Sequence, residues 1–146
     1  MIKSFFVIFV CFGCALLGQS IHDTPVLYLE KNACYGQCPV YKLEIFLSGK
    51  MTFNGIANTK FNGHYCSNID KNNLNRLIEE FNRKNYLSME DNYLSRAKDL
   101  PTTTTGFKYN GKQKRICDYD KAPPELKQLE KMLETLADTT SWNNCQ

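Results

Sequence analysis

The spacing of the apolar residues changes along this chain, and the change limits the folds that the chain can adopt. Between residues 41 and 45 apolar and charged side chains alternate, which is the period of a strand with one buried face. Two later segments have instead the spacing of one face of a helix. Their apolar residues are Leu74, Leu77, Ile78 and Phe81 in the first, and Leu126, Leu129, Leu133 and Leu136 in the second. A chain with both periods contains both strands and helices.

The turn signals divide the strand-forming segments from one another. Gly49 and the pair Asn110-Gly111 each predict a hairpin, Asp70 predicts a helix start, and the pair Pro123-Pro124 opens the last helix. We therefore predict an α+β fold, a two-layer sandwich whose mainly antiparallel sheet of about six strands is covered by two amphipathic helices. The expected order is β-β-β-β-α-β-β-α, with strands at 25–32, 40–47, 51–57, 60–66, 102–109 and 112–119.

Residues 1–20 have the three parts of a secretory signal peptide. Lys3 is the positive residue, residues 5–17 are apolar and uncharged, and the small residues Gly18 and Ser20 follow. The apolar stretch is too short to span a bilayer, so we expect no transmembrane segment in the mature chain. Lipid anchoring at Cys14 is not expected, because the residues before it fit a lipoprotein signal poorly. We predict an exported protein, periplasmic or extracellular, with a single domain at 21–146.

The composition excludes several classes of function. The formal charge is +3 and the basic residues form no patch along the sequence, so we expect no nucleic-acid partner. The sequence contains no glycine-rich phosphate loop and only two histidines, His22 and His64. A nucleophile–histidine pair is hard to build from these residues. We therefore predict no catalytic residues and no cofactor. The sequence favours a protein without enzymatic activity.

Five cysteines follow the signal peptide, and an odd number in an exported protein leaves at least one thiol unpaired within the chain. Cys34 and Cys38 flank a short loop and are candidates for a local disulfide. Two alternatives remain open. Cys34, Cys38, His64 and Cys66 are the residue types of a zinc site. Alternatively, Cys34 or Cys38 acts as the nucleophile of a small thiol-dependent enzyme.

The segment Ala-Cys-Tyr-Gly-Gln-Cys-Pro-Val-Tyr at 33–41 resembles the opening motif of an uncharacterised family of bacterial envelope proteins, a domain of unknown function. The family pattern is A-C-[FY]-G-x-C-P-x-Y. Asp99-Leu100-Pro101-Thr102 resembles a later stretch of the same family, and the resemblance extends over about residues 27–142. It implies a protein that is exported or lipid-anchored, and it implies no known activity.

The motif loop is the best candidate for a functional surface. Loops held by a rigid scaffold often carry binding residues, and Tyr35 lies in such a loop beside Gly36. We take Tyr35, Gly36, Tyr41 and Asp99 as candidate binding residues. The function we expect is a non-enzymatic binding or structural role at the cell envelope, with a protein or an envelope component as partner. The alternative is a small thiol- or zinc-dependent enzyme that uses Cys34 and Cys38.

Overall fold

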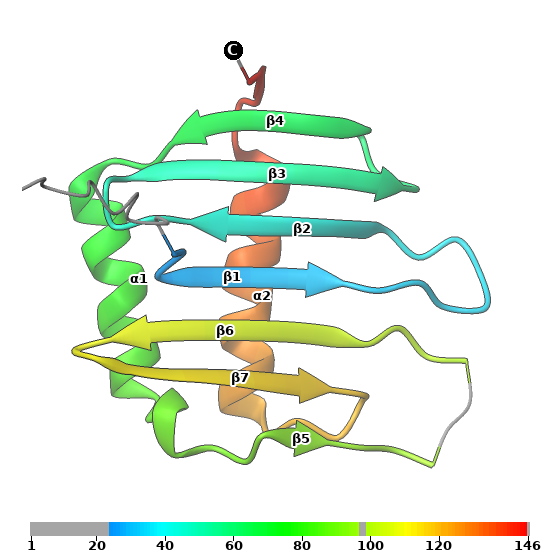
Figure 1. Ribbon diagram of the computed structural model, residues 1–146. Helices are drawn as coiled ribbons and strands as arrows, with labels where there is room; N and C mark the ends of the chain where they lie inside the picture. Colours follow the sequence, from blue (N-terminus) through cyan, green and yellow to red (C-terminus); the bar gives the residue numbers. More distant parts are fainter. Residues whose placement is uncertain (1–23, 97–98, 146) are drawn as a thin grey trace, which may run out of the picture.

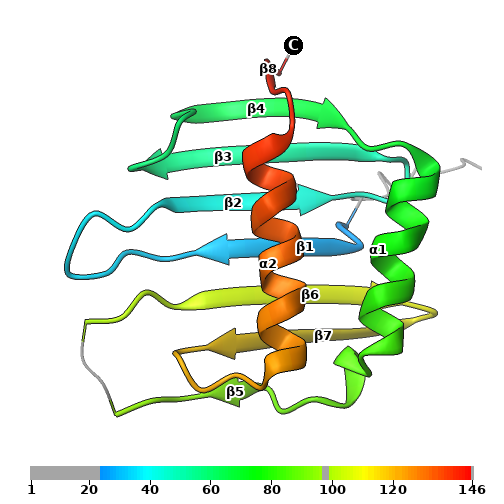
Figure 2. The ribbon, with the colours of Figure 1, turned by 180° about the vertical axis from the view of Figure 1, so that it is seen from behind.

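The computed structural model describes residues 24–96 and 99–145. One mixed sheet forms a layer, and both long helices lie on the same face of it (Figures 1 and 2). The strands are β1 (Leu27–Lys31), β2 (Val40–Ile45), β3 (Lys50–Ala57), β4 (Gly63–Asn68), β5 (Asn92–Tyr93), β6 (Thr103–Tyr109), β7 (Lys112–Asp118) and β8 (Asn143–Asn144). The helices are α1 (Lys71–Arg83), the 3-10 turn η1 (Tyr86–Ser88) and α2 (Pro124–Thr139). The expected signal peptide, with Cys14, lies outside the described residues.

The α+β class and the mainly antiparallel sheet are confirmed, but the expected strand count is wrong. The described chain has eight strands in the spatial order β5-β7-β6-β1-β2-β3-β4-β8. The two additional strands, β5 and β8, are two residues long and lie at opposite edges of the sheet. β5 pairs with β7 in parallel, whereas the other pairs are antiparallel. A strand of two residues has no measurable hydrophobic period, so the sequence pattern contains no signal for either.

The core lies between the sheet and the two helices. Side chains alternate across a strand, so β1, β2, β3 and β6 each turn one row of residues towards the helices. Asp70 begins α1 as expected, since its Oδ1 accepts a hydrogen bond from the backbone N–H of Asn73. The central buried residues are Leu27, Leu29, Leu43, Ile45, Phe81, Phe107, Ile116, Leu126, Leu129 and Leu133. The predicted helical stripes thus supply the helix side of this core.

The topology gathers four connections at one end of the sheet, which we call the loop end. They are the β1–β2 loop at 32–39, the β3–β4 connection at 58–62, residues 99–102 before β6 and the connection from β7 to α2 (Figure 1, right side). β1 is central in the sheet and pairs with both β2 and β6. The β1–β2 loop carries the sequence motif, and we call it the motif loop. It therefore lies beside segments from three other parts of the chain.

Candidate binding site at the loop end of the sheet

The motif loop is closed by a disulfide bond between Cys34 and Cys38, whose Cα atoms lie 5.7 Å apart. Asn58, from the β3–β4 connection, donates a side-chain hydrogen bond to the carbonyl oxygen of Cys38 at 3.1 Å. On the opposite side the backbone N–H of Tyr35 donates to the carbonyl oxygen of Asp99 at 3.4 Å. The loop is thus fixed by its own covalent bond and by hydrogen bonds to each neighbouring connection, including one from the backbone N–H of Asn32 to the carbonyl oxygen of Thr102 at 3.0 Å.

Tyr35 is the most exposed large hydrophobic residue in the described chain, with 88% of its surface accessible. Gly36 beside it and Asp99 across the hydrogen bond are also exposed. The structure therefore brings together three of the four candidate binding residues, and we call Tyr35, Gly36 and Asp99 the motif surface. A loop backbone that is already held in one shape loses little conformational freedom when a partner covers it.

Tyr41, the fourth candidate, occupies a different environment. It is 5% exposed and stacks on Phe53, with 5.1 Å between the ring centroids. Burial raises the pKa of its hydroxyl, and the nearby carboxylates of Glu134 and Asp138 raise it further. Tyr41 therefore stays protonated at physiological pH. It can contact only a ligand that enters the hollow beneath the loop.

That hollow, the motif hollow, has a volume of about 520 Å³. It lies between the motif loop, the β3–β4 connection and the C-terminal half of α2. Its apolar lining comes from Pro39, Tyr41, Phe53 and Phe61, and its charged lining includes Lys31 and Glu134. An aromatic floor with charges at the rim suits a ligand that has both apolar and polar parts.

A second hollow of about 300 Å³ adjoins the first, and we call it the acid hollow. It lies between residues 100–103, residues 118–120 and the N-terminal half of α2. The two hollows share Lys31, Pro101 and Glu134 in their linings. Lys31 Nζ and Glu134 Oε1 form an ion pair at 2.6 Å on this shared boundary. The two hollows therefore adjoin each other across this ion pair, beside the motif surface.

Gly55 allows the β3–β4 connection to fold back onto β3. A Cβ atom at this position would lie 1.8 Å from the carbonyl oxygen of Phe61 and 2.6 Å from Thr59 Oγ1. Since the first of these is a backbone atom, Gly55→Ala should displace the connection and destabilise the protein by about 1–3 kcal/mol. Urea denaturation would measure this. Ile56→Ala, at the exposed neighbouring position, is the matched control, and equal stability of both variants would contradict the prediction.

The described cysteines form two disulfide bonds, so the expectation that the protein contains disulfides is confirmed. The second bond joins Cys66 to Cys145, which are 79 residues apart, and Cys117 is free. The alternative zinc set is not assembled, because Cys34, Cys38 and Cys66 are all in disulfides and offer no thiolate. A thiol reaction at Cys34 or Cys38 would first require reduction of their bond. The described residues contain no group of three or more His, Cys, Asp or Glu side chains suited to a metal ion.

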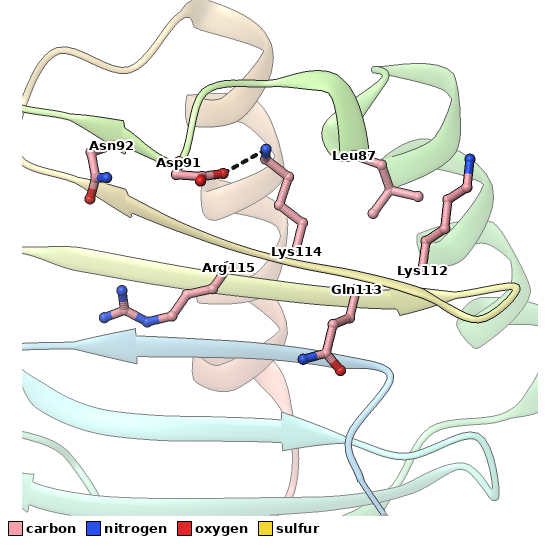
Figure 3. Close-up of a pocket in the computed structure, with 7 residues that line it drawn as sticks. All are labelled: Leu87, Asp91, Asn92, Lys112, Gln113, Lys114 and Arg115. Carbon is pink, nitrogen blue, oxygen red and sulfur yellow. Dashed lines mark ion pairs between the residues drawn. The ribbon is translucent and has the colours of Figure 1, made fainter.

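A third hollow, of about 610 Å³, lies at the edge of the sheet beside β7 (Figure 3). Lys114 points to Asp91 and forms an ion pair with it at 2.7 Å. Figure 3 shows Lys112 on the same side of β7, whereas Gln113 and Arg115 point to the other side. The polar side chains alternate around the strand and do not converge on one point. The loop end therefore remains the better candidate site.

Sequence reasoning missed the acid hollow and its buried carboxylates. Asp118 on β7 and Glu130 on α2 are 2% and 4% exposed, although both are acidic. One signal was present for Glu130, because it stands four residues after Leu126 and three before Leu133, on the apolar stripe. A charged residue on such a stripe indicates a buried polar group with a specific purpose.

Together these features define a small disulfide-bonded α+β domain with a rigid, exposed loop beside a concave region. Residues 25–137 match the family described as Domain of unknown function (DUF6438), and the chain belongs to this family. A comparison with curated proteins found no match. In the described part of the chain, every helix is too short or too polar to cross a membrane.

Proposed function

We propose that this protein is an exported, non-enzymatic binding module of the cell envelope, periplasmic or extracellular, which contacts a protein or an envelope component through the motif surface. The observation that carries the proposal is the exposure of Tyr35 on a loop closed by a disulfide. Aromatic residues beside a pocket often dominate the free energy of binding. A loop already fixed in its bound shape also reduces the entropic cost of association.

Two further observations support export. Disulfide bonds persist in oxidising compartments, and four of the described cysteines are paired. Residues 1–20 have the pattern of a signal peptide, whose removal would leave a single domain at 21–146. The proposed mature protein thus reaches its partner outside the cytoplasm. A structural role without a ligand is the competing form of this proposal.

Site-specific photocrosslinking in the producing cell tests the motif surface. A photoreactive amino acid at Gln37, which is exposed in the motif loop, should give one discrete adduct. Adding Tyr35→Ala should lower the adduct yield about tenfold, because truncation of a central aromatic contact often costs more than 1.4 kcal/mol. Asp99→Ala should lower it less.

The control uses the same photoreactive residue at Leu47, which is 70% exposed in the turn between β2 and β3. That turn lies at the end of the sheet away from the loop end (Figure 1). An adduct of equal yield from Leu47, or an adduct at Gln37 that Tyr35→Ala leaves unchanged, would place the contact elsewhere. Identification of the adduct by mass spectrometry would distinguish a protein from an envelope component.

A further inference from the structure

Glu130 is a buried acid with an unused acceptor. Its side chain lies on the sheet-facing side of α2, and the residue is 4% exposed. Oε1 has no hydrogen-bond partner among the described residues, and Oε2 lies 3.8 Å from Lys127 Nζ. A buried acceptor left without a partner costs about 1–3 kcal/mol. Oε1 itself is shielded from solvent, so a ligand in the acid hollow, which Glu130 lines, would satisfy this carboxyl group after the carboxyl group rotates towards it.

The other buried or partly buried carboxylates around this hollow already have partners. Asp118 Oδ1 accepts hydrogen bonds from the backbone N–H groups of Lys121 and Ala122, at 3.1 and 3.0 Å. Asp118 Oδ2 pairs with Lys127. Glu134 pairs with Lys31 across the boundary of the two hollows. Among the buried carboxyl groups of this hollow, Glu130 therefore has the weakest partner, a single lysine at 3.8 Å.

The charged groups around the acid hollow are also unequal in number. Its lining contains four carboxyl groups and three lysines, so one carboxylate lacks a matching cation. The groups are Asp118 on β7, Asp120 in the following connection, Glu130 and Glu134 on α2, with Lys31 on β1 and Lys127 and Lys131 on α2. One added positive charge would make this set neutral.

We propose that the acid hollow binds the alkylammonium group of a lysine side chain from a partner peptide, with the Glu130 carboxylate as its principal acceptor. An ammonium group is a compact charge with three donors, which matches one buried acceptor and the neighbouring carboxylates. The assignment of the group to a partner peptide rests on the proposed function and deepens it. Leu100, next to Asp99 of the motif surface, lines the acid hollow, so a peptide that covers the motif surface lies close to this hollow.

When no ammonium group is bound, the Glu130 carboxyl group carries a proton instead. Burial, followed by the charge of Asp118, raises the pKa of Glu130 to about 8, despite the opposing effects of Lys127 and Lys31. Binding of the cation therefore releases this proton, and affinity should increase with pH up to about 8. Lys127 and Tyr86 of η1, which Glu130 also influences, have raised pKa values and keep their protons throughout this range.

Titration of the purified protein with Nα-acetyl-lysine amide, followed by NMR, tests the inference. The probe carries only the ammonium charge, and Nα-acetyl-norleucine amide is the matched probe without it. We expect saturable shifts at the amides of Lys121, Ala122 and Glu130, with affinity rising up to about tenfold per pH unit between pH 6 and 8 at constant ionic strength. Glu130→Gln should weaken binding at pH 8 about tenfold or more and remove the pH dependence.

Two further variants keep the result interpretable. Asp120→Asn should weaken binding less, because Asp120 is exposed, and Glu125→Gln in the first turn of α2 should have no effect. Equal shifts with the norleucine probe, or binding unchanged in Glu130→Gln, would overturn the inference. The titration needs no partner, so it can fail while crosslinking at the motif loop succeeds, and the reverse result is equally visible.

Discussion

Replacing both Cys66 and Cys145 with serine is expected to lower the free energy of unfolding by about 2–5 kcal/mol. The bond joins residues 79 apart, and a long loop restricts the unfolded chain more than a short loop does. Cys34→Ser with Cys38→Ser opens a loop of sequence separation 4, so its cost should be smaller. Urea denaturation followed by the fluorescence of Trp142, the only tryptophan in the sequence, measures both.

The fluorescence of Trp142 also reports on the tail of the chain, because the Cys66–Cys145 bond holds this tail against the sheet. Trp142 is 8% exposed, its indole N–H donates to the carbonyl oxygen of Ala137 at 2.9 Å, and its ring lies 5.3 Å from that of Phe53. Phe53 lines the motif hollow. Cys117→Ser is the control for loss of a thiol. A greater loss of stability in the Cys34–Cys38 variant would contradict the loop-length argument.

The helices were the most predictable part of the fold. Leu74, Leu77, Ile78 and Phe81 are all buried on α1, as their spacing predicts. A stripe of this kind can be buried only against another apolar layer, so the sequence already implied that α1 covers a sheet.

The sequence pattern did not predict the strands and the disulfide bond that depend on a neighbour distant in sequence. β8 exists because Asn143 and Asn144 pair with Cys66 and Tyr65, and a pattern within the tail cannot show this. The pairing of Cys66 with Cys145 is likewise a consequence of which strand lies at that edge. Five cysteines allow many connectivities, and sequence alone does not choose among them.

The candidate site likewise has one part that the sequence predicts and one part that it does not. The motif loop is continuous in sequence, so Tyr35 and Gly36 could be proposed from the printed chain. The acid hollow combines Lys31, Asp118 and Glu130, which come from β1, β7 and α2. Only the topology places them together. A single acid on an apolar stripe is a weak signal until the residues opposite it are known.

Glu130→Gln is expected to change the pH dependence of stability more than any other single substitution in the site. The folded state keeps a proton on Glu130 up to a pKa of about 8, whereas the unfolded chain loses it near the ordinary value of 4.5. Between these values the folded state binds more protons. The contribution of Glu130 to stability is therefore full below pH 4.5 and falls as pH rises, by up to about 1.4 kcal/mol per pH unit.

Glutamine has the shape of the protonated acid and does not titrate, so the variant should lack this decline. We expect wild type and Glu130→Gln to differ by less than about 1 kcal/mol at pH 5 and the variant to be more stable by about 2–4 kcal/mol at pH 8. Urea denaturation at pH 5, 6, 7 and 8 gives both curves. Glu125→Gln should follow the wild-type curve, because Glu125 is exposed. Parallel curves for wild type and Glu130→Gln would show that the buried carboxyl already has a counter-charge in solution, and would also remove the reason for an ammonium ligand in the acid hollow.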